Sequence, residues 1–192
     1  MTGEHATGLA STWVARFAPL VPSGEVLDLA CGAGRHARLL AALGHPVTAV
    51  DRDTDALAAA AGPGIATMRV DLEDESAPRP VWPFAAGRFA GIVVTNYLHR
   101  PLFPHILASL APGGMLIYET FAIGNERFGK PSSPRFLLNR GELLDLVRTD
   151  AMKIHVLAFE DGYVDWPKPA MVQRICALKD GGGAVEHAWR LA

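Results

Sequence analysis

The residues best suited to chemistry are two glycines and two acids that follow short apolar runs. Gly32 and Gly34 come directly after the run VLDLA and before a helix-like segment, and Asp51 and Asp71 close the next two apolar runs. Glycines where a strand passes into a helix let the backbone approach a ligand, and the helix start offers unpaired N–H groups. An acid about 20 residues later suits ribose hydroxyls. The pattern favours a nucleoside ligand over the alternative of a simple tight turn with two helix caps.

Asp28 lies inside the first apolar run, four residues before Gly32. A carboxylate there would repel a pyrophosphate but attract an ammonium group. A dinucleotide-binding turn usually has a third glycine, and Ala37 stands at that position. The pattern therefore indicates an adenosine that carries an amino acid. A nicotinamide-dependent reductase is the rival enzyme class.

Apolar runs alternate with helix-like segments along the rest of the chain. We expect strands at 26–30, 45–51, 64–71, 88–96, 115–121, 152–160 and 171–179. We expect helices at 5–17, 35–44, 53–62, 140–148 and 102–111, the last ended by a Pro-Gly-Gly turn at 112–114. Alternation implies a mostly parallel sheet with helices on both faces. The last two strands, joined by residues 161–170, should form an antiparallel hairpin at one edge. The prediction is an α/β fold with a doubly wound, Rossmann-like sheet of seven strands.

We expect residues 1–192 to form a single domain with a helical N-terminal extension at 1–22. The formal net charge of −2 provides no electrostatic footprint for nucleic acid or an anionic membrane. No apolar run approaches the ~20 residues that cross a bilayer. Cys31 and Cys176 make neither a disulfide framework nor a metal pattern, which fits a reducing cytosol. The expected protein is cytoplasmic, without metal, membrane or nucleic-acid partners, and its oligomeric state is left open.

Five segments carry a resemblance to a known family. VLDLACGAGRHA, TAVDRD, RVDLED, FAGIVVTNYLH and LAPGGMLIYET follow one another between residues 26 and 121. Together they resemble the successive motifs of class I S-adenosylmethionine-dependent methyltransferases. The layout of the later part is similar to small methyltransferases of the tellurite-resistance type. The resemblance implies methyl transfer from S-adenosylmethionine to a small-molecule acceptor, with S-adenosylhomocysteine as product.

The same resemblance implies two groups of cofactor-binding residues. The methionine end would be held by the glycine turn and its neighbours: Asp28 on the ammonium, Cys31, Gly32, Gly34, Arg35 near the carboxylate, and Asn96 near the methyl. The adenosine end would be held after the second and third strands: Asp51 on the ribose, Arg52 beside the adenine, and Asp71 with Leu72 at its edge. For Arg35 the alternative is an exposed residue in the first turn of a helix.

Methyl transfer is an in-line displacement, so it requires alignment and exclusion of water rather than a metal or a covalent nucleophile. A base is needed only where the acceptor must lose a proton. Tyr97, His99 and Glu119 are the candidates near the expected methyl. Their alternative roles are an apolar wall, a capping histidine and the partner of an arginine. Cys31 is interpreted as a small packing residue rather than a nucleophile.

The segment 124–140 is the expected substrate-side insertion. It combines cations with aromatic rings: Arg127, Phe128, Lys130, Arg135, Phe136 and Arg140. One interpretation is a lid over an anionic or aromatic acceptor, and the other is a solvated loop. Core or surface-turn packing is the role expected of Trp82, Tyr163 and Trp166, and the alternative is that they add aromatic walls to the site. Methylation of RNA through this segment, and cofactor binding without catalysis, are the alternative functions.

Overall fold

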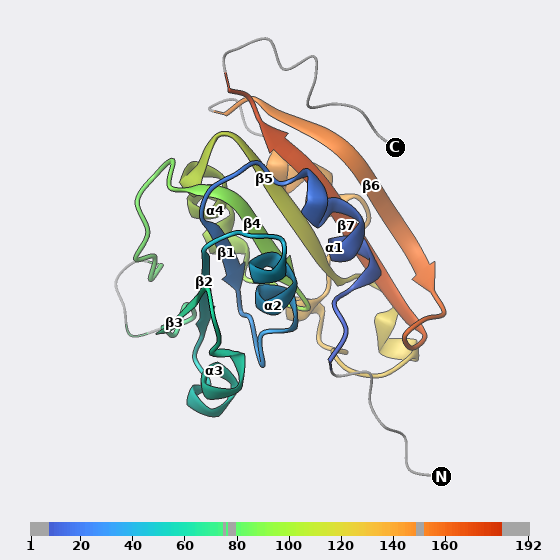
Figure 1. Ribbon diagram of the computed structural model, residues 1–192. Helices are drawn as coiled ribbons and strands as arrows, with labels where there is room; N and C mark the ends of the chain where they lie inside the picture. Colours follow the sequence, from blue (N-terminus) through green and yellow to red (C-terminus); the bar gives the residue numbers. More distant parts are fainter. Residues whose placement is uncertain (1–7, 75, 77–79, 149–151, 182–192) are drawn as a thin grey trace.

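Seven strands form one mixed sheet in a computed structural model that describes residues 8–74, 76, 80–148 and 152–181 (Figure 1). The strands are β1 (Val26–Leu29), β2 (Val47–Asp51), β3 (Ile65–Arg69), β4 (Phe89–Thr95), β5 (Leu110–Phe121), β6 (Ile154–Val164) and β7 (Ala170–Lys179). Their order is β3-β2-β1-β4-β5-β7-β6. Strands β1 to β5 pair in parallel, whereas β7 is antiparallel to both β5 and β6. The predicted fold class is confirmed.

Helices cover both faces of this sheet. They are α1 (Thr12–Phe17), α2 (Arg35–Ala42), α3 (Thr54–Ala60), α4 (Phe103–Ser109) and α5 (Glu142–Val147). Single 3₁₀ turns occupy Ala18–Leu20, Arg100–Leu102, Asn125–Arg127 and Pro134–Phe136. Helices α1 and α2 lie on one face and α4 on the other (Figure 1).

Alternate residues of the central strands contribute side chains to two separate hydrophobic cores, because successive side chains point to opposite faces of the sheet. Val26 and Val93 pack with α1, α2 and α3. Leu27 and Ile92 pack with α4 and α5 on the other side. Burial on both faces explains why the central strands are continuous apolar runs rather than alternating ones.

The junction between α4 and β5 differs from the prediction. The helix ends at Ser109 rather than at the Pro-Gly-Gly turn of residues 112–114, and β5 begins at Leu110, which pairs with Phe89 before the register shifts. Lys179 explains the early end of the helix. Its Nζ donates to the carbonyls of Leu107, Ala108 and Leu110 at 3.1, 3.1 and 2.7 Å. An ammonium at this position satisfies carbonyls that a helix end leaves unpaired.

The N-terminal helix and the final turn are both shorter than predicted. Helix α1 begins at Thr12, where Ser11 Oγ accepts the N–H of Trp13 at 3.2 Å, and residues 5–7 of the expected helix lie outside the described residues. In the hairpin, β6 continues to Val164 and β7 begins at Ala170, so the connection is only 165–169. Pairing across the hairpin has converted half of the expected loop into strand.

Gly34 is required by packing as well as by backbone conformation. Its φ is +75°, and a Cβ there would lie 2.6 Å from Ala60 Cβ and 2.8 Å from Ala60 Cα in α3. Gly44, just beyond the end of α2, has a φ of +92°, but a Cβ on it would meet no atom within 4 Å. An alanine at position 44 would therefore carry only the free-energy cost of a left-handed backbone, whereas an alanine at position 34 would add a steric clash with α3.

Gly34→Ala is expected to destabilise the protein more than Gly44→Ala. Placing alanine in the left-handed region costs about 1–2 kcal/mol at either site, and overpacking against α3 adds about 1–3 kcal/mol at position 34. Urea denaturation of both variants measures the difference in unfolding free energy. Equal losses would show that α3 moves away at no cost and that the close approach of α2 and α3 is not a constraint.

Candidate functional site

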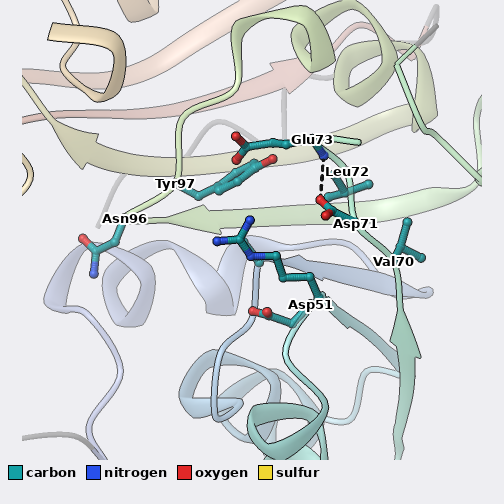
Figure 2. A pocket seen from close by; sticks show the side chains of 9 residues that line it. Asp51, Val70, Asp71, Leu72, Glu73, Asn96 and Tyr97 are labelled. Carbon is teal, nitrogen blue, oxygen red and sulfur yellow. Dashed lines mark hydrogen bonds between the residues drawn. The ribbon is translucent and has the colours of Figure 1, made fainter. Parts of the chain in front are cut away.

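Two neighbouring cavities open at the carboxyl ends of the parallel strands. The smaller has a volume of about 270 Å³ and is lined by Ala30 and by residues 51–52, 70–73 and 96–97 (Figure 2). The larger, of about 530 Å³, lies between residues 9–12, the start of α2, the end of β5 and the β6–β7 hairpin. Asn96 lines both cavities. They meet where β1 has β2 on one side and β4 on the other, the position at which doubly wound sheets bind ligands.

Two non-glycine residues at this junction have left-handed backbones. Ala30 follows β1 with a φ of +54°, and Asn96 follows β4 with a φ of +55°. Such conformations are costly for residues with a side chain and often occur at functional sites. Gly32, in the turn after Ala30, has a φ of +51°, and a Cβ on it would meet no atom within 4 Å. The turn is thus exposed to a ligand at the position where the sequence places its first glycine.

Asp51 is held in place by backbone groups on both sides. Its Oδ2 accepts the N–H of Gly32 at 2.8 Å, and its Oδ1 accepts the N–H of Asp53 at 3.0 Å. These bonds join the end of β2 to the glycine turn. Each carboxylate oxygen keeps a further lone pair for a ligand hydroxyl.

The opposite wall of the smaller cavity comes from the segment after β3 and from Tyr97. Asp71 Oδ1 accepts the N–H of Glu73 at 3.0 Å, which folds residues 71–73 into a turn (Figure 2). The Tyr97 side chain points toward this wall, whereas Asn96 points away from it (Figure 2). Burial raises the pKa of the Tyr97 phenol, and the nearby Glu73 adds to the rise. Tyr97 is therefore protonated at neutral pH.

Asp28 is buried beneath the glycine turn, with only 1% of its surface exposed. Its Oδ2 accepts the N–H of Ala37 in the first turn of α2 at 2.8 Å. Burial raises the pKa of Asp28 to about 7, although the Ala37 N–H and the charge of Arg35 oppose the rise. The carboxyl group is consequently near its midpoint at neutral pH and would gain from a cation placed nearby.

His36 joins α2 to the wall of the larger cavity. Its Nε2 accepts the N–H of Ser11 at 3.1 Å, and its Nδ1 lies 3.4 Å from Thr95 Oγ1. Burial lowers the pKa of His36 to about 3, so the ring is neutral and the bond to residue 11 persists across the neutral range. This bond places residues 9–12 against the site.

An ion pair lies at the base of the larger cavity. Glu119 Oε2 is 2.5 Å from Arg174 Nε, and Arg174 Nη1 also contacts Glu160 Oε2 at 3.3 Å. Glu119 is 7% exposed, so its charge is almost fully removed from water. The arginine that the sequence offered as the alternative partner of Glu119 is therefore present.

The predicted site residues fall into three groups. The smaller cavity brings together Asp51, Arg52, Asp71, Leu72, Asn96 and Tyr97. Arg35, Asn96 and Glu119 line the larger one. Five residues line neither: Asp28, Cys31, Gly32, Gly34 and His99. Burial raises the pKa of the Cys31 thiol to about 12, which agrees with a packing role rather than a nucleophilic one.

Of the three proposed proton carriers, two lie near one acid and the third lies apart. Tyr97 belongs to the smaller cavity and Glu119 to the larger. Glu73 acts on the Tyr97 phenol and also lies 4.0 Å, at Oε2, from His99 Nδ1. Glu119 instead pairs with Arg174.

Sequence reasoning missed part of the site. Glu73 lines the smaller cavity, and Trp166 and Lys168 in the β6–β7 turn line the larger. An acid two residues after Asp71 was a signal for Glu73. Trp166 lies in a surface turn, one of the places expected for it, with 57% of its surface exposed, and it also lines the cavity, as its alternative role of an aromatic wall requires. None of residues 124–140 lines either cavity, and Arg135 instead lies 3.9 Å from Glu73 at the rim.

Neither a metal cluster nor a membrane span is found in the described part of the chain. No three His, Cys, Asp or Glu side chains there gather closely enough to hold a metal ion. No described helix has the length and hydrophobicity that crossing a bilayer requires.

Comparisons with known proteins find methyltransferases by both sequence and structure. A family model described as a methyltransferase domain matches residues 3–164. A protein-L-isoaspartate O-methyltransferase of Chlorobaculum tepidum is 36% identical over 109 residues, 56% of this chain and 49% of that protein. A trans-aconitate 2-methyltransferase of Delftia acidovorans is 33% identical over 112 residues, 53% of this chain and 39% of that protein. The chain thus spans about half or less of the length of these curated relatives.

Among solved structures, TehB from Haemophilus influenzae superposes with a TM-score of 0.69 at 18% identity. The match covers 89% of this chain and 63% of TehB. At that identity the likeness concerns the fold.

Asp28→Asn is expected to change how stability depends on pH. An acid whose pKa rises from 3.8 to about 7 on folding holds its proton more tightly when folded, so its contribution to stability is lost as the pH rises across that interval. Asparagine can still accept the Ala37 N–H. The unfolding free energy of the variant minus that of the wild type should therefore increase by roughly 1–4 kcal/mol between pH 4 and 7.

Urea denaturation of both proteins at several pH values provides this difference. His36, whose pKa falls on folding, has the opposite pH dependence, but it is present in both proteins and cancels in the difference. A difference that stays constant from pH 4 to 7 would show that Asp28 is already ionised in the folded protein.

Proposed function

The chain belongs to the methyltransferase-domain family, and from that premise we propose that it transfers a methyl group from S-adenosylmethionine to a small-molecule acceptor. Family membership, the class I fold and the cofactor agree with the predictions made from the motifs. The observation that carries the proposal is the pair of cavities that meet at Asn96, at the switch point of the sheet.

The smaller cavity suits the adenosine part of the cofactor. Asp51, fixed by Gly32 and Asp53, would accept hydrogen bonds from the ribose hydroxyls. Asp71 and the buried side chain of Leu72 would border the adenine, with Arg52 beside it. Tyr97, on the same wall, adds an aromatic face to this set.

The methionine part would extend past Asn96 toward the larger cavity. The open backbone of Gly32 leaves room there, and Arg35 lines the larger cavity on the side of α2. Asp28 lies beneath the same turn and would ionise fully beside an ammonium group, because an adjacent cation lowers the pKa of a carboxyl.

When bound, S-adenosylmethionine supplies an electrophilic methyl group on a sulfonium. The chain then has to align an acceptor with that methyl and exclude water. Asn96 lines both cavities and so lies on the path between cofactor and acceptor. Of the three candidate proton carriers, Glu119 alone lines the cavity assigned to the acceptor, where Arg174 holds its carboxylate in place.

The size of the larger cavity supports a small-molecule acceptor. Its volume of about 530 Å³ falls in the range of about 300–1,000 Å³ that is usual for small-ligand pockets. One relative is named for trans-aconitate, a small molecule. Both cysteines are free, which fits action in the reducing cytoplasm.

Asp51→Ala is expected to lose most of its affinity for S-adenosylhomocysteine while the protein stays folded, because the ribose hydroxyls lose their acceptor. Calorimetric titration should give a dissociation constant at least about tenfold higher than that of the wild type. Asp55→Ala is the matched control, since Asp55 is an exposed acid in the first turn of α3 outside both cavities.

Two results would count against this function. An Asp51→Ala affinity within about a factor of two of the wild type would remove the ribose assignment. Binding of NADH but not of S-adenosylhomocysteine by the wild type would assign the site to another nucleotide. The thermal melting of each variant distinguishes a lost contact from a lost fold.

A further inference from the structure

The β6–β7 turn forms one wall of the larger cavity. Trp166, Pro167 and Lys168 all line it, together with Val164 and Ala170 at the adjoining strand ends. The turn also contains Pro169, so two of its five residues have a restricted φ. A short turn between two paired strands, stiffened by two prolines, holds its side chains at a fixed place above the cavity.

Trp166 offers an aromatic surface that the fold itself does not use. It is 57% exposed, and among the described residues no aromatic ring packs on it and no hydrogen-bond partner meets its indole N–H. The other described tryptophans differ: Trp13 packs on Phe17, and Trp82 donates to Ser109. A large exposed ring that lines a cavity is available to stack on a planar ligand.

The charges around the larger cavity favour an anion. Its lining contains three cations, Arg35, Lys168 and Arg174, and a single acid, Glu119. Arg174 is neutralised by Glu119 and Glu160. Lys168 has no ion pair or hydrogen bond to any described residue.

Arg35 and Lys168 reach this cavity from different elements. Arg35 belongs to the first turn of α2, beside the glycine turn, where the proposed function needs a partner for the cofactor carboxylate. Lys168 is on the hairpin, next to the aromatic ring of Trp166. The ammonium group of Lys168 is therefore available to bind the acceptor.

We propose that the acceptor is a planar or aromatic anion, carrying a carboxylate or a phosphate, that stacks on Trp166 and pairs with Lys168. This inference rests on the proposed function and specifies its acceptor. It moves acceptor recognition from segment 124–140, where the sequence placed a cationic and aromatic lid, to the β6–β7 turn.

The test uses four probes that share one ring: benzoate, phenyl phosphate, neutral benzamide and cationic benzylamine. Each is titrated into the full chain, saturated with S-adenosylhomocysteine, by calorimetry. We expect at least one of the two anions to bind about tenfold or more tightly than benzamide and benzylamine. Whether benzoate or phenyl phosphate binds better distinguishes a carboxylate acceptor from a phosphate ester.

Three variants assign the contacts. Lys168→Gln should reduce the preference for the anion to about twofold or less, and Trp166→Ala should weaken benzoate and benzamide alike. Lys130→Gln, which changes an exposed lysine of segment 124–140, is the matched control and should bind like the wild type. All three should bind S-adenosylhomocysteine with unchanged affinity and melt near the wild-type temperature.

The proposal is overturned if benzamide or benzylamine binds as tightly as the anions, if no probe binds at millimolar concentration, or if Lys168→Gln behaves like the wild type. Loss of anion binding in Lys130→Gln alone would return recognition to segment 124–140. In each of these cases intact binding of S-adenosylhomocysteine leaves the proposed function standing, whereas failure of that binding removes the proposed function itself.

Discussion

A buried carboxylate–amide hydrogen bond fixes the geometry of the whole site. Asp28, inside β1, accepts the N–H of Ala37 in α2, so the strand and the helix that flank the glycine turn are joined beneath it. The turn between them is then closed from above by the bond from Gly32 to Asp51. Removing a carboxylate from water is costly, and the raised pKa of Asp28 reflects that cost. A cationic ligand group above the turn would offset part of it, which links folding to cofactor binding.

The two cavities differ in charge, and in the proposed function this difference would order the cofactor and the acceptor along the carboxyl edge of the sheet. Asp51, Asp71 and Glu73 line the smaller cavity with one cation, Arg52. The larger cavity has the reverse balance, with three cations and Glu119. Acceptors of hydrogen bonds suit ribose and adenine, whereas unpaired cations suit an anion. In the proposed function Asn96, which is neutral, occupies the boundary where the electrophilic methyl group would pass.

The sequence was informative wherever function depends on the end of a parallel strand. Asp51, Asp71 and Asn96 each follow an apolar run, and parallel strands bring such ends to a common edge, so their proximity could be predicted. Trp166 and Lys168 could not be found in this way. They reach the site because β7 inserts between β5 and β6, a long-range pairing that no local pattern specifies. The early end of α4 likewise depends on Lys179, about 70 residues away.

The direction of the last two strands determines where acceptor recognition can reside. Because β7 is antiparallel to both its neighbours, β6 runs parallel to β5, and the turn between β6 and β7 lies at the edge where β5 ends. Phe121 at the end of β5 pairs with Val172, only two residues after β7 begins. The turn thus stands directly beyond Glu119 and Phe121, while β1, β2 and β3 lie at the other side of the sheet. If the proposed function holds, changes in residues 165–169 would therefore alter the acceptor without disturbing the strands assigned to the cofactor.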